Sequence, residues 1–171
     1  MYKSLLLLIF ILHPALNKPD GLPIWFNKAF QEQTLSQKYA IIKTNSSYFL
    51  EADFNGDKKV DIAVQIQDKI TGKTGIILMN YGQKNGFIFG AGKKFDDQRF
   101  DNTRAFNGWR VYKDKYVFKT IFKPNGDILG GKKIKLSHPA VYIYNVEDGD
   151  EIAGELIYWD GAKYIIIHQG E

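Results

Sequence analysis

Cysteine is absent from all 171 residues. That absence excludes disulfide bonds, thiol catalysis and thiolate metal sites, so we expect packing alone to stabilise the fold. It also favours a bacterial-type exported protein over a small disulfide-rich extracellular module. The sequence likewise lacks a phosphate-binding glycine loop, an H-E-x-x-H zinc motif and a G-x-S-x-G nucleophile turn. No common catalytic signature therefore points to a reaction.

Long apolar runs are also missing. The apolar run at residues 5–12 follows Lys3, and at eight residues it is far shorter than the roughly 20 that a membrane-spanning helix needs. A positive charge before a short apolar run is typical of a secretory signal. We therefore predict a signal peptide over residues 1–17, cleaved after Ala15 or Asn17, followed by one domain over residues 18–171. The expected location is periplasmic or secreted, with no integral membrane segment after signal removal.

The sequence has no long run of basic residues. The chain has 23 Lys and Arg residues against 19 Asp and Glu, a net charge of +4, and no basic run is longer than two residues. Nucleic-acid-binding proteins usually gather positive charge in a patch or along one helix. The lysine pairs at 58–59, 93–94 and 132–133 each lie beside turn residues, which favours solvated loops. We predict no nucleic-acid partner and expect an unknown protein or glycan partner instead.

Residues 22–40 have a helical pattern. Pro23 suits a first helical turn, and apolar residues recur at spacings of three and four to give one apolar stripe. These residues are Leu22, Trp25, Phe26, Ala29 and Phe30. We predict one amino-terminal helix that covers one face of a sheet.

The rest of the chain is mainly β in character. Asx-Gly pairs, which favour tight hairpin turns, separate short runs of aromatic and β-branched residues at irregular intervals. This pattern predicts antiparallel strands folded into a sandwich or an open barrel or meander, and it argues against a solenoid. The predicted strands are 47–53, 60–67, 74–81, 86–89, 109–112, 116–122, 133–136, 141–146, 154–159 and 163–168.

Two of these strands carry further predictions. In residues 60–67, Val60, Ile62 and Val64 alternate with polar or small residues, which predicts one dry face and one wet face. Residues 164–167 are apolar on both faces. We therefore expect the last strand to be central, or to be covered on its second side by the amino-terminal helix.

The loop at residues 53–61 carries the most specific chemical pattern. Hard cations such as calcium take six to eight oxygen ligands, and oxygen-bearing side chains here recur at every second residue. The candidate calcium ligands are Asp53, Asn55, Asp57, Lys59 through its carbonyl, and Asp61, with Glu51 as an outside candidate. The alternative is a hairpin turn in which the Asp and Asn side chains cap their own backbone amides without an ion.

The pattern D-x-N-G-D-x-x-x-D, followed by residues 62–64, resembles the calcium-binding loop of the FG-GAP and VCBS repeat families. The resemblance implies a loop that joins two strands of a propeller blade and binds calcium. Lys58 replaces the glycine usual for the sharp turn and Val64 replaces the bidentate glutamate of an EF-hand, so the expected binding is weak. A whole propeller is excluded because its four or more blades need about 40 residues each.

Two further groups of residues suggest alternative functions. Carboxylates that meet in a deep pocket would indicate a small hydrolase; the candidates are Asp96, Asp97, Asp101, Glu147, Asp150 and Glu155. Aromatic side chains in a flat exposed row would indicate a carbohydrate- or peptidoglycan-binding module; the candidates are Tyr112, Tyr142, Tyr144, Tyr158, Trp159 and Tyr164. His168 follows an apolar strand, where it could bind a ligand or act in catalysis.

Taken together, these patterns predict a non-catalytic binding or structural module of the cell envelope with a weak calcium-binding hairpin loop. The glycan-binding module and the carboxylate-dependent hydrolase are the alternatives.

Overall fold

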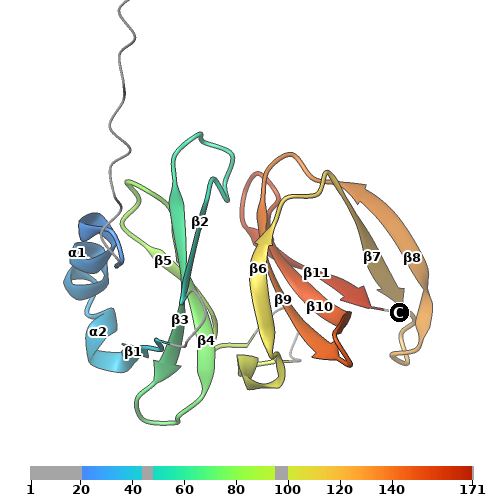
Figure 1. The fold of residues 1–171 in the computed structure, drawn as a ribbon, viewed down its shortest axis with the longest axis horizontal. Coiled ribbons are helices and arrows are strands. Elements are labelled where there is room, and N and C mark those ends of the chain that lie inside the picture. Colours follow the sequence, from blue (N-terminus) through green and yellow to red (C-terminus); the bar gives the residue numbers. More distant parts are fainter. Residues whose placement is uncertain (1–20, 44–47, 95–99, 171) are drawn as a thin grey trace, which may run out of the picture.

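The computed structural model describes residues 21–43, 48–94 and 100–170, so the predicted signal peptide and residue 47 lie outside it. Four layers follow one another in Figure 1: a helical layer, a five-stranded sheet, a four-stranded sheet and a two-stranded hairpin. Every strand pairing is antiparallel. The predicted mainly β fold is therefore confirmed, as a sandwich of open sheets. No helix in the described part is long and apolar enough to span a membrane.

The helical layer is shorter than the predicted helix. It consists of α1 (Ile24–Glu32) and the single turn α2 (Leu35–Lys38). Thr34, between them, has a left-handed backbone with a φ of 57°, which interrupts the helix. The chain then becomes extended in β1 (Tyr39–Ile41), a strand that the helical pattern did not predict. Phe26 and Phe30 are buried against the sheet, as the apolar stripe predicts.

The five-stranded sheet is covered on both faces. Its other strands are β2 (Phe49–Ala52), β3 (Asp61–Asp68), β4 (Thr74–Met79) and β5 (Gly86–Gly90), in the order β1-β3-β4-β5 with β2 also paired to β3. On β3, Ile62 and Val64 pack under the helical layer, while Ala63 packs against the second sheet. The predicted wet face of this strand is therefore wrong for its first half, because Asp61 and Ala63 are both fully buried, whereas Gln67 is exposed.

The four-stranded sheet has the order β11-β10-β9-β6. Its strands are β6 (Gly108–Tyr112), β9 (Ala140–Glu147), β10 (Asp150–Trp159) and β11 (Tyr164–Gly170). On β11, Ile166 packs toward the first sheet and Ile167 packs in a cluster with Val117 of the hairpin. The strand lies at one end of the sheet, so the predicted central position is wrong. Its second cover is this hairpin, so the predicted covering by the helix is wrong too.

The hairpin consists of β7 (Tyr116–Phe122) and β8 (Ile128–Lys135), which begins five residues before the predicted strand at 133. Val117 and Leu136 anchor it in the core. The Thr120 hydroxyl also donates a hydrogen bond of 2.8 Å to the carbonyl oxygen of Gly170 on β11. Apart from such contacts, β8 is exposed along nearly its whole length.

Candidate functional site

Asp61 organises the loop at residues 53–61 from inside the protein. Its carboxylate is fully buried, and it accepts hydrogen bonds from the backbone N–H groups of Phe54 (2.9 Å), Asn55 (3.2 Å) and Tyr81 (2.9 Å). Burial raises the pKa of Asp61 to about 6 and outweighs these three donors, which favour the charged form. Phe54 is fully buried between the two sheets. The loop is therefore held by its own first residues and by the loop after β4.

The remaining Asp and Asn side chains of the loop cap its backbone. Four hydrogen bonds do this: Gly56 N to Asp53 Oδ1 (2.7 Å), Lys58 N to Asp53 Oδ2 (2.8 Å), Asp57 N to Asn55 Oδ1 (3.0 Å) and Lys59 N to Asp57 Oδ1 (2.9 Å). Gly56 and Lys58 both have positive φ angles, of 79° and 68°, so the backbone turns tightly around these acceptors. This is the self-capped turn of the alternative interpretation.

The geometry of the loop bears on the calcium prediction. Its described residues include no group of three or more His, Cys, Asp or Glu side chains that could hold a metal ion, and the same is true of the rest of the described chain. The Lys59 ammonium lies 3.8 Å from Asp57 Oδ2, which partly neutralises the most exposed carboxylate of the turn. The five predicted ligands thus lie in one loop, but Asp61 faces the backbone of that loop and of its neighbour. Calcium binding stays a prediction.

The carboxylates proposed for a hydrolase do not meet in one pocket among the described residues. Asp96 and Asp97 lie outside the described part. Asp101 bonds to Lys73, and Glu147 and Asp150 are exposed at the turn between β9 and β10.

Glu155, the last of these carboxylates, pairs with His168. The His168 Nδ1 atom lies 2.7 Å from Glu155 Oε1, and the two side chains are 23% and 12% exposed. The Phe122 ring meets the imidazole edge-on at 5.5 Å between ring centroids. The pair lines a pocket of about 350 Å³ that also includes Phe100 and Phe106. The carboxylate orients the imidazole, as in many ligand-binding and catalytic sites, but among the described residues that line this pocket Glu155 is the one candidate carboxylate.

The candidate aromatic residues do not form a flat exposed row. Tyr112, Tyr142 and Tyr158 are 6%, 4% and 9% exposed. Trp159 packs edge-on against Tyr164, and both side chains are half-buried. Three of the six rings are therefore core residues, and the other three are half-buried.

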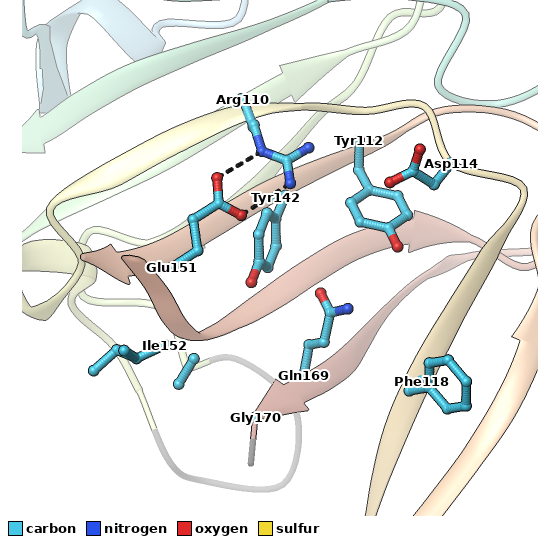
Figure 2. A pocket seen from close by; sticks show the side chains of 10 residues that line it. Arg110, Tyr112, Asp114, Phe118, Tyr142, Glu151, Ile152, Gln169 and Gly170 are labelled. Atoms are coloured by element: carbon cyan, nitrogen blue, oxygen red, sulfur yellow. Dashed lines mark hydrogen bonds and ion pairs between the residues drawn. The ribbon is translucent and has the colours of Figure 1, made fainter. Parts of the chain in front are cut away.

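A polar cleft opens beside three of the tyrosines, on the face of the four-stranded sheet that carries the hairpin. Figure 2 shows Arg110 of β6 and Glu151 of β10 joined by two parallel hydrogen bonds. The Nε–Oε1 and Nη2–Oε2 distances are both 3.0 Å. This fork geometry is the strongest form of a carboxylate–guanidinium pair. The pair raises the pKa of Arg110 and lowers that of Glu151, so both stay charged over a wide pH range.

The guanidinium of Arg110 also lies over aromatic rings. Its central carbon is 5.0 Å from the ring centroid of Tyr142, 5.4 Å from that of Tyr112 and 5.8 Å from that of Tyr144. Glycines make room for two of these rings: a Cβ atom on Gly108 would lie 2.3 Å from the ring of Tyr144, and one on Gly154 would lie 2.4 Å from that of Tyr142. The cation is therefore held by rings on one side and by a carboxylate on the other.

The cleft has a volume of about 400 Å³ and is lined by polar groups. Burial raises the pKa values of the Tyr112 and Tyr142 hydroxyls, which therefore stay protonated. Figure 2 shows Gln169 between these hydroxyls and the strand end, with its amide turned toward the tyrosines. The Gln169 Oε1 atom is buried and has no hydrogen-bond partner within the described chain. Phe118 of β7 forms the opposite wall. We call this site the Arg110 cleft.

Sequence reasoning missed Arg110 and Gln169. A signal was present, because Arg110 and Tyr112, like Tyr142 and Tyr144, are two residues apart on strands and so share one face. What the spacing could not show is that β6 and β9 are neighbours, with Arg110 directly opposite Tyr142.

The Arg110 cleft and the loop at 53–61 are the two candidate sites that the side-chain geometry indicates. The likeness of the loop to FG-GAP and VCBS repeats stays a resemblance of about a dozen residues. Comparison of the chain with protein-family models, curated proteins and solved structures finds no match in any of the three.

Proposed function

We propose that the protein is a non-catalytic, exported binding module of the cell envelope, periplasmic or secreted, and that it binds a glycan in the Arg110 cleft. One observation carries this proposal: a bidentate Arg110–Glu151 pair stands over tyrosine rings at a polar cleft. A sugar presents hydroxyl groups around its edge and C–H groups on its faces. It therefore needs fixed hydrogen-bonding groups next to aromatic rings.

The groups in the cleft complement such a ligand. Arg110 and the Tyr142 hydroxyl are donors, whereas Glu151 and Gln169 Oε1 are acceptors. A buried acceptor without a partner costs about 1–3 kcal/mol, so a ligand hydroxyl that reached Gln169 would recover part of that energy. The volume of about 400 Å³ lies within the usual range for small-ligand sites and suits a short saccharide.

Two features support binding without catalysis. The pairing with Arg110 lowers the pKa of Glu151, which makes this carboxyl a poor proton donor near neutral pH. In addition, the described members of the candidate carboxylate set are separated: Glu155 lines a pocket beside His168, whereas Glu147 and Asp150 are exposed at a turn. The carboxylate-dependent hydrolase is therefore the weaker hypothesis.

A titration with glycans tests the proposal. Saccharides, including peptidoglycan fragments, would be added to isotope-labelled protein while the amide signals of the cleft strands are followed. We expect Arg110→Lys, which keeps the charge but loses the fork, to weaken binding about tenfold. Arg104→Lys is the matched control, because Arg104 is exposed outside the cleft lining, and it should bind like the natural protein. Equal affinity of both variants, or no response to any glycan, contradicts the proposal.

We also propose that the loop at 53–61 binds calcium weakly. A carboxylate oxygen has two lone pairs, so an oxygen that accepts one amide hydrogen bond retains a site for a cation. Bound calcium would lower the negative charge of the turn and stabilise the folded state in proportion to its occupancy.

Calorimetry and thermal unfolding in millimolar calcium test this second proposal. We expect a small rise in melting temperature that Asp57→Ala abolishes, whereas Asp127→Ala, at the exposed turn of the β7–β8 hairpin, leaves it unchanged. Neither heat nor a thermal shift in the natural protein would end the calcium proposal.

A further inference from the structure

The positive charge of the protein is concentrated on the hairpin. Residues 113–135, which we call the basic hairpin, contain seven lysines and two aspartates, a net charge of +5. The lysines are Lys113, Lys115, Lys119, Lys123, Lys132, Lys133 and Lys135. The rest of the chain has 16 basic and 17 acidic residues. The excess positive charge of the chain therefore comes from one element.

Among the described residues, none of the seven hairpin lysines takes part in an ion pair with a carboxylate. Lys119 lies directly opposite Lys132 in the strand register, a pairing of like charges that destabilises a hairpin. The Lys133 ammonium instead lies 4.4 Å from the ring centroid of Tyr116. The fold thus retains a concentration of positive charge that it does not neutralise.

Apolar side chains are exposed on the same element. Of the nine large hydrophobic residues exposed in the described chain, five belong to it: Tyr116, Phe118, Ile121, Ile128 and Leu129. Leu129 is 64% exposed and Ile128 is 50% exposed, and both follow the turn at 123–127. Figure 1 shows β8 as the outermost strand, at the end of the molecule away from the helices. The tip therefore presents aliphatic groups flanked by lysines to the surroundings.

We propose that the basic hairpin docks the protein on an anionic lipid surface. Clusters of four to eight basic residues attract anionic headgroups, and neighbouring apolar side chains enter the boundary between headgroups and acyl chains. The aliphatic residues favour a lipid over a soluble polyanion, because a polyanion would neutralise the lysines and leave Ile128 and Leu129 in water. This inference goes beyond glycan binding and does not depend on it.

Cosedimentation with vesicles tests the role of the lysines. The full chain would be mixed with vesicles of phosphatidylcholine alone or with about 30% phosphatidylglycerol. We expect binding to the anionic vesicles only, and binding that weakens as salt rises from about 50 mM to about 500 mM.

A charge-matched pair of triple variants sharpens that test. Replacing Lys119, Lys132 and Lys133 by Gln should weaken vesicle binding at least about tenfold. The same replacement at Lys58, Lys84 and Lys163, exposed lysines outside the hairpin, removes equal charge and should change binding less than about twofold. Thermal unfolding confirms that both variants fold. Equal loss in the two variants, or binding to neutral vesicles alone, overturns the proposal.

The aliphatic tip separates a lipid surface from other polyanions. The double variant Ile128→Ser with Leu129→Ser should weaken binding to anionic vesicles about tenfold. The control is Ile24→Ser with Ile70→Ser, which changes two exposed isoleucines outside the hairpin and should leave binding unchanged. A DNA duplex and dextran sulfate serve as soluble polyanions. If the tip variant binds vesicles like the natural protein while the lysine variant loses binding to vesicles and polyanions alike, the partner is a soluble polyanion and the proposal is wrong.

Discussion

The loop at 53–61 and the basic hairpin treat their charges in opposite ways. In the loop, Asp53, Asp57 and Asp61 all accept hydrogen bonds from backbone amides. In the hairpin, seven lysines have no ion-pair partner among the described residues. The loop has the more specific sequence motif, yet its carboxylates already have hydrogen-bond partners. The hairpin has no such motif, yet it offers more charged groups that a ligand could bind. A motif shows which groups are present, whereas its contacts show whether those groups are already in use.

The difference has a physical cause in side-chain length. Asp and Asn are short enough to reach the amides of their own turn, so a bend rich in them satisfies itself. A lysine ammonium lies at the end of a long side chain, too far from the strand to bond to the backbone amides of its own turn, so it contacts whatever packs over that strand. On a two-stranded hairpin at the end of the molecule, that is solvent or a partner.

Replacing Asp61 should give the largest effect. Asp61→Asn puts an amide NH₂ against backbone donors, and at least one buried N–H loses its acceptor. We expect the free energy of unfolding to fall by roughly 2–4 kcal/mol. Asp57→Asn, which keeps an acceptor at an exposed position, should change it by less than about 0.5 kcal/mol. Chemical denaturation measures both values, and similar losses would show that the buried end of the loop is not special.

The pH dependence of stability should reveal the same carboxyl. The folded protein holds the Asp61 proton more tightly than the unfolded chain, because its pKa rises from 3.8 to about 6. The contribution of this group is therefore fully present below about pH 4 and is lost as pH rises through 6, by roughly 3 kcal/mol in total.

Comparison with Asp61→Asn isolates this effect. The pKa values of Asp68 and Glu151 are lowered, so they shift stability in the opposite direction, but they do so equally in both proteins. The stability advantage of the natural protein should widen as pH falls from about 7 to about 4. An advantage that stays constant over this range would contradict the raised pKa.

Lys119→Glu should give the smallest effect, with the opposite sign. It replaces a like-charge pair across the hairpin by an attraction to Lys132, so we expect the free energy of unfolding to rise by about 0.5 kcal/mol at low salt. High salt should remove the gain. Lys163→Glu, exposed and outside the hairpin, is the control for net charge. A destabilised Lys119→Glu protein would indicate that the lysines are already satisfied within the fold.

Much of the fold could be predicted because its signals are local. Asx-Gly turns and runs of β-branched and aromatic residues located β7 with its observed bounds and most other strands to within two residues. The errors came from contacts distant in sequence. Tyr39 left the helical pattern because it pairs with Asp68, and the first half of β3 lost its expected wet face because a second sheet covers it.

The candidate sites divide in the same way. The loop at 53–61 was visible because its oxygen-bearing residues follow one another, although the inward turn of Asp61 depends on the amide of Tyr81. The Arg110 cleft was not visible, because Arg110 and Glu151 lie 41 residues apart. The basic hairpin was missed for a different reason: its lysines are spread along two strands and become one surface only when those strands pair.

By itself, the amino-acid sequence determined the β character, the turns, the absence of disulfides and the self-capping chemistry of the loop. These properties depend on backbone preferences and on side chains that reach only a few residues. The tertiary structure alone decided which sheet faces are covered, that Arg110 meets Glu151 over the tyrosines, and that the hairpin lysines have no carboxylate partner in the described part of the chain. Those outcomes depend on strand order and layer packing, which join residues that the chain keeps far apart.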